Sequence, residues 1–312
     1  MLDVERIDAI QVNNTLGEGV LWNSRESSVW WTDIHEKKLY RLTWPERELE
    51  VFDTPERLCA FAFTDLDNCI VAAFETGFAL YDYRQEKVLW KKSVLQKGGG
   101  IRFNDGKIDR QGRFWAGTMA EDGREEAAGI LYCLDSNGVV SQHAQNIHIS
   151  NGCCWDVSSS HFYFADSPRR SIYRYKFDPR RGDLGERELF ARTALGIYPD
   201  GATVDSEGYL WSAQWRGARI QRYSPEGKLA GAIPVPVSQP TCVTFGGANM
   251  DLMFVTSARE SLHEWTLDRE RLAGSLLVFK TPFKGVIGFR FSTTQLLNQC
   301  DAVQKPSEPV TA

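Results

Sequence analysis

The sequence has 312 residues, 42% of them hydrophobic and 25% charged, as in ordinary globular proteins. Its net charge of −5 argues against nucleic acid as the main partner, and no apolar run is long enough to suggest a membrane span. Because the N-terminal residues lack a basic-then-apolar signal pattern, we expect a cytoplasmic protein.

The seven cysteines do not suggest a disulfide framework or a metal cluster. Their number is odd, and no pair has the CxxC spacing that thiolate zinc sites use. The adjacent Cys153 and Cys154 would point to opposite faces of a strand. We expect both to be small buried side chains, as free cysteines usually are.

Short aromatic and β-branched runs, separated by turn residues, recur along the chain. The pattern strand, turn, strand appears in six segments: 21–42, 61–87, 107–138, 153–178, 203–229 and 243–260. The first turns of successive segments are 41 to 49 residues apart, the period of a four-stranded propeller blade. The sequence therefore predicts an all-β fold, a six-bladed β-propeller that forms one domain over residues 1–306, with a short tail at 307–312.

Equivalent residues of the six repeats carry oxygen-bearing side chains. The residue five positions before the first turn is, in order, Glu18, Ala60, Asn104, Asn151, Asp200 and Thr241. We expect this position just ahead of the innermost strand, where successive blades face the central channel. An Asn or Asp before Gly also forms turns, so one such position alone would favour a turn. Four equivalent positions, one of them a Glu, instead indicate a ring of oxygen ligands.

Oxygen ligands favour one hard divalent cation, Ca²⁺, Mg²⁺ or Mn²⁺, with Zn²⁺ and Fe(II) as alternatives. Three or four protein ligands would leave positions open for water and substrate, as a Lewis-acid site requires. Arg102, two residues before Asn104, would bring a guanidinium to the same channel mouth. From spacing alone, a surface salt bridge is an equally good interpretation of Arg102.

Five motifs span nearly the whole chain: LGEGVLW (16–22), RFNDGKIDRQGRFWAGTM (102–119), ISNGCCW (149–155), YPDGATVDSEGYLW (198–211) and PTCVTFGG (240–247). In content and order they resemble the gluconolactonase/regucalcin (senescence marker protein) family of six-bladed propeller lactonases. The second motif is long and specific. The resemblance implies that Glu18, Asn151 and Asp200 hold a divalent metal.

The same resemblance assigns Arg102 and Asn104 to substrate binding, together with an acidic residue shortly after GTM. Counting without gaps places that acid at Asp122, and the adjacent Glu121 is the alternative. The implied partner is a small sugar lactone, an aldonolactone, which is hydrolysed to the aldonic acid. We expect Asp200 to serve as general base for the attacking water as well as a metal ligand.

Two other functions stay open at this point. One is a calcium-binding regulatory protein without turnover, as in the regucalcin branch of the resemblance. The other is a phosphotriesterase-like propeller hydrolase. The sugar, the metal and the oligomeric state do not follow from the motifs. The Arg102–Asn104 pair favours a hydroxylated substrate, and we therefore expect a lactonase.

Overall fold

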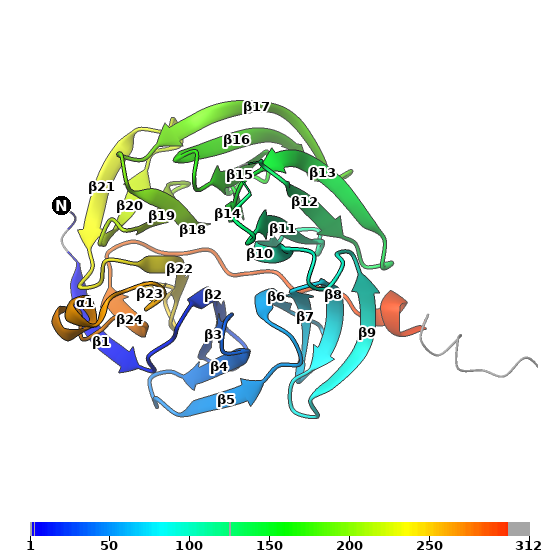
Figure 1. Ribbon diagram of the computed structural model, residues 1–312, viewed down its shortest axis with the longest axis horizontal. Helices are drawn as coiled ribbons and strands as arrows, with labels where there is room; N and C mark the ends of the chain where they lie inside the picture. The colour runs from blue at the N-terminus through cyan, green and yellow to red at the C-terminus, as the bar shows by residue number, and fades with distance from the viewer. Residues whose placement is uncertain (1, 3, 125, 299–312) are drawn as a thin grey trace, which may run out of the picture.

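The computed structural model describes residues 2, 4–124 and 126–298. They form six four-stranded antiparallel sheets arranged in a ring (Figure 1). This arrangement confirms the predicted six-bladed β-propeller. In each sheet one strand lies at the centre of the ring, and the others follow outward.

The first three blades contain consecutive strands. Blade one consists of β2 (Gly17–Asn23), β3 (Ser28–Asp33), β4 (Lys38–Thr43) and β5 (Leu49–Asp53). Blade two consists of β6 (Leu58–Phe63), β7 (Cys69–Phe74), β8 (Gly77–Asp82) and β9 (Lys87–Ser93). Blade three consists of β10 (Ile101–Ile108), β11 (Phe114–Ala120), β12 (Gly129–Leu134) and β13 (Val140–Ile147).

The other three blades complete the ring. Blade four consists of β14 (Ser150–Trp155), β15 (His161–Asp166), β16 (Ser171–Asp178) and β17 (Asp183–Arg192). Blade five consists of β18 (Tyr198–Val204), β19 (Leu210–Trp215), β20 (Arg219–Tyr223) and β21 (Leu229–Pro234). Blade six consists of β22 (Pro240–Gly246), β23 (Leu252–Ser257), β24 (Ser275–Lys280) and β1 (Glu5–Gln11), with the helix α1 (Glu264–Arg269) between β23 and β24.

Blade six is built from both ends of the described chain. Its outer strand β1 precedes blade one in sequence and pairs antiparallel with β24. The ring is thereby closed through backbone hydrogen bonds. The sixth sequence repeat covers β22 and β23 but gave no sign of this closure, because β1 carries no turn signature of its own.

The turn that marks each repeat is built around a buried aspartate in two of the blades. Asp205 Oδ1 accepts hydrogen bonds from the backbone N–H of Glu207 (3.0 Å) and Tyr209 (2.9 Å), and Oδ2 accepts one from Trp211 Nε1 (2.8 Å). Asp109 accepts the same three kinds of hydrogen bond at its own turn, at 2.9, 2.9 and 3.0 Å. This aspartate therefore fixes the turn and anchors the core tryptophan six residues later, which explains the sequence period.

We expect Asp205→Ala to lower the free energy of unfolding by about 3–5 kcal/mol, because it removes the buried carboxylate that holds the turn, Trp211 and the guanidinium of Arg222. Arg222, whose side chain is only 9% exposed, donates to Asp205 Oδ2 from Nε (3.0 Å) and Nη2 (2.7 Å). Glu207→Ala is the matched control, since Glu207 pairs with the same arginine from an exposed position and should cost under about 1 kcal/mol. Urea unfolding measures both variants, and equal losses would contradict the prediction.

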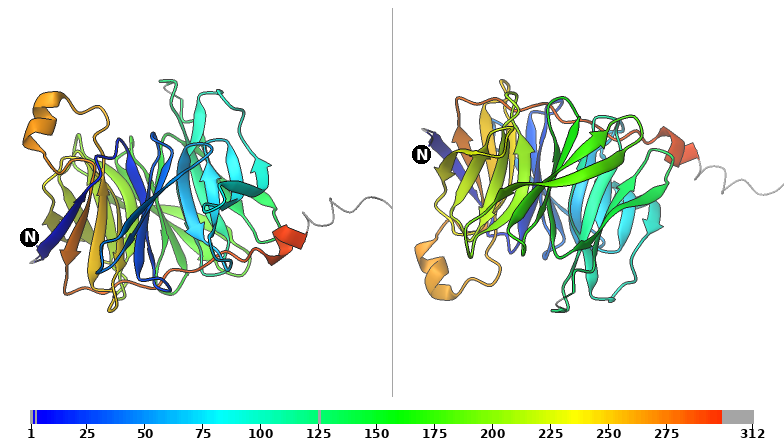
Figure 2. Two further views of the ribbon diagram at one scale, coloured as in Figure 1. Left: turned by 90° about the horizontal axis from the view of Figure 1, so that it is seen from below. Right: turned by 90° about the horizontal axis from the view of Figure 1, so that it is seen from above.

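After β24 the chain crosses one end of the propeller. We call residues 281–298 the strap. The backbone N–H of Ser206 donates to the carbonyl of Lys284 (2.8 Å), and that of Phe291 donates to the carbonyl of Phe63 (2.9 Å). The strap thus runs from blade six past blade five to blade two, and it lies on the face opposite α1 (Figure 2). One end of the central channel is therefore covered by the chain itself.

The cysteine prediction is confirmed for the described residues. Cys153 and Cys154 are buried and unbridged, as are the other four cysteines of this part of the chain. Cys300 and the expected tail at 307–312 lie outside the described residues. None of the helices in the described ranges is long and apolar enough to cross a membrane.

Candidate functional site

Each of the six innermost strands carries a β-bulge at or next to its ring position, by which we mean the equivalent residue that the sequence repeat identifies in each blade. The pairing register shifts between Glu18 and Leu21 in β2 and between Asn151 and Cys154 in β14. The corresponding shifts in β6, β10, β18 and β22 lie at 58–60, 103–106, 199–202 and 240–243. The ring residues lie inside the strands, so our expectation that they precede the strands was wrong by a few residues. Each bulge accommodates one extra residue of the innermost strand, so this strand pairs with its neighbour on both sides of the bulge.

Two buried carboxylates lie on the innermost strands of blades one and five. Glu18 and Asp200 are 8% and 6% exposed. Burial, together with the charge of Asp105, raises the pKa of Glu18 to about 8. Burial and then the charge of Glu18 raise the pKa of Asp200 as well. Among the described residues, neither carboxylate forms an ion pair with Lys, Arg or His.

The side-chain amide of Asn151 is oriented by hydrogen bonds on both of its ends. Its Nδ2 donates to Ser167 Oγ (2.8 Å), which in turn donates to the carbonyl of Pro199 (2.7 Å). Its Oδ1 accepts from Asn104 Nδ2 (2.9 Å). Because the amide nitrogen is committed to Ser167, the oxygen lies on the Asn104 side and keeps a lone pair free.

Arg102 is linked to this amide pair and is not a surface residue. It is 4% exposed, and its Nη1 donates to Asn104 Oδ1 (2.7 Å) and to the carbonyl of Phe103 (2.9 Å). A continuous chain of hydrogen bonds therefore runs from Arg102 through Asn104 to Asn151. The surface part of the salt-bridge interpretation is wrong, because Arg102 is buried, although it does form an ion pair with Glu121.

Of the two acids after GTM, only Glu121 contacts Arg102. Glu121 Oε1 accepts from Arg102 Nε (2.7 Å), and its carboxylate also binds both terminal nitrogens of Arg57 (2.9 and 2.7 Å). Burial opposes ionisation of Glu121, yet the hydrogen bonds and charges of Arg57 and Arg102 hold its pKa below the usual range. Asp122 is exposed and pairs with Arg124, whose hydrogen bond lowers the pKa of Asp122 to about 2.

The two remaining ring positions contribute no free oxygen. Ala60 has none, and Thr241 Oγ1 donates to the carbonyl of Gly17 (2.5 Å) and also lies within hydrogen-bond distance of Thr256 Oγ1 (2.8 Å). Of the four oxygen-bearing positions predicted from the repeat, Asn104 already accepts a hydrogen bond from Arg102 with its oxygen, which leaves Glu18, Asn151 and Asp200.

Asp105 is a channel residue that sequence reasoning missed. Its Oδ1 accepts from the backbone N–H of Gly106 (2.8 Å), and its Oδ2 accepts from that of Cys153 (3.3 Å) in the next blade. Burial raises its pKa, although the charge of Lys107 and the backbone hydrogen bonds oppose this. In a regular strand Asp105 would point away from the side of Asn104, but the bulge between Phe103 and Gly106 turns both toward the channel.

The donor set fits a hard divalent cation. The described residues contain no group of three or more His, Cys, Asp and Glu side chains that could hold a metal ion. What they offer instead is two carboxylates, from Glu18 and Asp200, and the amide oxygen of Asn151. Two buried carboxylates that repel one another and have no basic partner are stabilised by a cation between them. All-oxygen donors suit the ions predicted from the sequence.

The comparisons with known proteins cover most of the chain. A family model described as "SMP-30/Gluconolactonase/LRE-like region" matches residues 16–259. A 6-deoxy-6-sulfogluconolactonase of Pseudomonas putida is 35% identical over 81% of this chain and 89% of its own length. An L-arabinolactonase of Azospirillum brasilense is 33% identical, covering 90% and 93% respectively.

Solved structures agree with the curated relatives. The crystal structure of a calcium-binding protein, regucalcin, from Agrobacterium tumefaciens superposes with a TM-score of 0.85 and 27% identity, covering 92% of this chain and 97% of that one. A luciferin-regenerating enzyme gives a TM-score of 0.82 at 26% identity, covering 93% and 99%. The residues matched by the family model include every ring position.

Proposed function

Because the chain belongs to the SMP-30/gluconolactonase/LRE-like family, we propose that it hydrolyses a sugar lactone to the corresponding aldonic acid with the help of a divalent metal. The observation that carries this proposal is the hydrogen-bond chain from Arg102 through Asn104 to Asn151. It joins the guanidinium that we propose to bind the sugar to Asn151, one of the proposed metal ligands. The reaction makes the protein a carboxylic-ester hydrolase.

In this proposal Glu18, Asn151 and Asp200 hold one divalent cation. When bound there, the cation would supply Lewis-acid stabilisation of the negative charge that develops on the lactone carbonyl oxygen. The Asp200 carboxylate accepts the proton of the attacking water. Its burial and the nearby Glu18 charge both favour proton uptake, which suits a general base.

Substrate binding falls to the polar groups at the mouth. Arg102 Nη2 has no hydrogen-bond partner among the described residues and is free to donate to a sugar oxygen. Glu121, held in place by two arginines, offers carboxylate oxygens to sugar hydroxyls. We propose Glu121 as the acidic substrate ligand, because Asp122 turns outward to Arg124.

The experiment that tests this function is a lactone panel. The purified protein is stripped of metal with a chelator and assayed on glucono-, galactono-, arabinono- and xylonolactone with Ca²⁺, Mn²⁺, Zn²⁺, Mg²⁺ or Fe(II) restored. We expect hydrolysis above the buffer rate that depends on the added metal. Tight calcium binding without hydrolysis of any lactone would instead favour the calcium-binding role named for the regucalcin structure.

We expect Arg102→Ala to lower kcat/KM for lactones by about 10- to 100-fold, the loss of one or two charge-assisted hydrogen bonds. Bound metal should stay at the wild-type level, because a guanidinium cannot ligate a cation. Arg57→Ala is the matched control, since Arg57 also binds Glu121 but has no hydrogen bond to Asn104. Steady-state kinetics gives kcat/KM, and metal analysis gives the bound metal of each variant. A wild-type kcat/KM in Arg102→Ala would show that Arg102 does not bind the substrate.

A further inference from the structure

The end of the channel under the strap holds a cavity that the proposed reaction does not use. Its volume is about 120 Å³. Strand β18 passes Asp200 near its start and reaches Thr203 and Val204 at its end, and only the latter two line the cavity. The cavity therefore lies at the opposite end of the channel from the candidate metal ligands.

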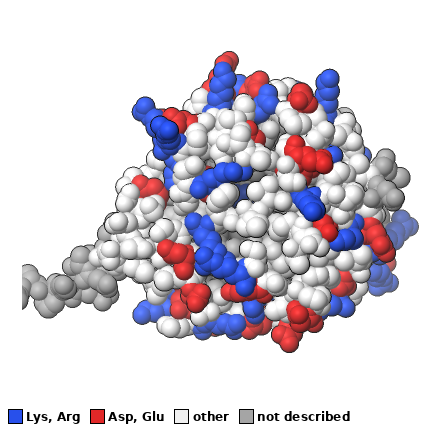
Figure 3. Space-filling view, turned by 180° about the vertical axis from the view of Figure 1, so that it is seen from behind, with Lys and Arg blue, Asp and Glu red and all other residues white. Residues whose placement is uncertain are grey.

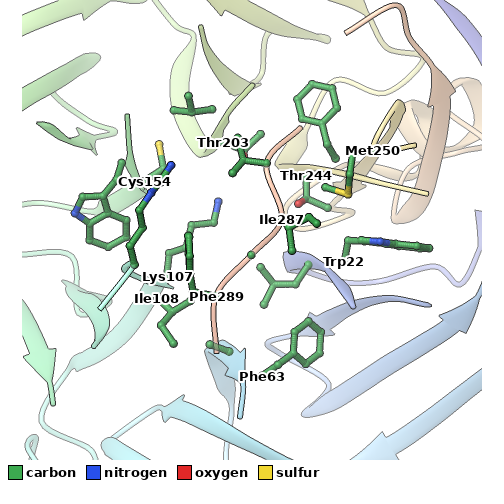
Figure 4. Close-up of a pocket in the computed structure, with 18 of the residues that line it drawn as sticks. Trp22, Phe63, Lys107, Ile108, Cys154, Thr203, Thr244, Met250, Ile287 and Phe289 are labelled. Carbon is green, nitrogen blue, oxygen red and sulfur yellow. The ribbon is translucent and has the colours of Figure 1, made fainter. Parts of the chain in front are cut away.

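Most of the lining is apolar. The innermost strands and the strap surround the space together, as Figure 4 shows for Trp22, Phe63 and Ile287. The apolar side chains that line it from the blades include Leu21, Trp22, Phe61, Val204, Phe245 and Met250. Strap residues Val286, Ile287 and Phe289 also line the space and are 39%, 59% and 37% exposed.

Two cationic side chains also line this cavity. Lys107 Nζ donates one hydrogen bond, to the carbonyl of Ala202 (2.7 Å), and forms no ion pair within the described part of the chain. The half-buried guanidinium of Arg110 lies 5.4 Å from the ring centroid of Phe289 and has neither a hydrogen bond nor an ion pair there. Basic side chains lie near the centre of this face in Figure 3.

One acid, Asp156, lines the cavity, and its carboxylate is already occupied. It accepts hydrogen bonds from Ser158 Oγ (2.7 Å) and from the backbone N–H of Ser160 (2.8 Å) within its own turn. The lining thus combines apolar walls with two cations that form no ion pair among the described residues, although Asp105 lies near enough to Lys107 for its pKa to respond to the lysine charge. A cation beside apolar surface is stabilised most by an anion that also forms hydrogen bonds with it.

We propose that the strap cavity binds a small organic acid with an apolar body, of about the size of benzoate, whose carboxylate faces Lys107 and Arg110. The volume suits one aromatic ring or a short aliphatic chain, since an apolar cavity of about 150 Å³ accepts benzene. An aldonate does not fit, because its hydroxyl groups would be buried against apolar walls without partners. This is a second site, distinct from the lactone site and independent of it.

The test is isothermal titration calorimetry of the full-length protein with benzoate, benzyl alcohol and benzylamine, which share the ring and differ in charge. We expect benzoate to bind at least about tenfold more tightly than benzyl alcohol, and benzylamine not to bind. Gluconate at equal concentration should not displace benzoate. Equal affinity for benzoate and benzyl alcohol, or no binding of benzoate, would overturn the proposal.

Three variants locate the site. Lys107→Met and Arg110→Gln should each weaken benzoate binding about tenfold, and Thr203→Phe should abolish it by filling the cavity. Arg110 lies in a surface turn, so Arg110→Gln decides the question even if Lys107→Met unfolds the protein. Lactone hydrolysis by Arg110→Gln should equal that of the wild type. Unchanged benzoate affinity in both Arg110→Gln and Thr203→Phe would place the acid elsewhere and overturn the proposal.

Discussion

Asp200→Asn is expected to lower kcat for lactone hydrolysis by a factor on the order of 10²–10⁴, which is the usual contribution of a positioned general base to the rate. Asparagine keeps the volume of the side chain and one ligand oxygen, so some metal binding should survive. It lacks a group that accepts a proton from water. The measurement is kcat at saturating metal, with occupancy of the variant confirmed separately by metal analysis.

Asp105→Asn is the matched control, because Asp105 is a half-buried carboxylate whose charge acts on both Glu18 and Asp200. Its oxygens accept hydrogen bonds from the backbone of Gly106 and Cys153, so they are less available to water. We expect its kcat to fall far less than that of Asp200→Asn. A large loss in Asp105→Asn with near wild-type turnover in fully occupied Asp200→Asn would make Asp105 the base.

The repeat made the blades and the ring positions predictable. In two blades the turn residue is an aspartate, Asp109 or Asp205, that holds both its turn and a core tryptophan, and the period of the turns locates each blade. Residues at the same phase of successive blades must face the same axis. Glu18, Asn104, Asn151 and Asp200 could therefore be grouped without any knowledge of their distances, whereas the choice of three of them as metal ligands came from the family resemblance.

The features that depend on a distant partner could not be predicted. The bulges depend on the register between neighbouring strands, and without them Asp105 would be assigned to the wrong side of β10. The proposed choice of Glu121 over Asp122 rests on contacts with Arg102 and with Arg57, and Arg57 lies 64 residues earlier in the chain. The strap carries no repeat signature, so its course across the channel and the cavity beneath it follow only from the structure.

We expect Glu18→Gln to weaken binding of the divalent metal by about 100-fold or more. Mutation of residues that only contact the ligands of a metal site typically weakens binding by about 10- to 100-fold, and loss of a direct ligand should weaken it further. The substitution removes one of two buried carboxylates and keeps the shape of the side chain. Titration calorimetry on the chelator-treated protein gives the affinity and the stoichiometry. Glu260→Gln is the matched control, since this glutamate binds His35 (3.0 Å), and its loss should leave metal affinity within a few-fold of wild type.

Glu18→Gln should change the melting temperature of the metal-free and the metal-bound protein in opposite directions. This difference distinguishes a metal ligand from an ordinary structural residue. Burial and the neighbouring acids destabilise the ionised Glu18 carboxylate, as its raised pKa shows. Without metal, Glu18→Gln should therefore melt at a higher temperature than wild type, because the repulsion with Asp200 is gone. With saturating metal the order should reverse, because only the wild type gains the full binding energy. Unchanged affinity and stoichiometry in Glu18→Gln, or a lower melting temperature in both conditions, would rule out Glu18 as a metal ligand.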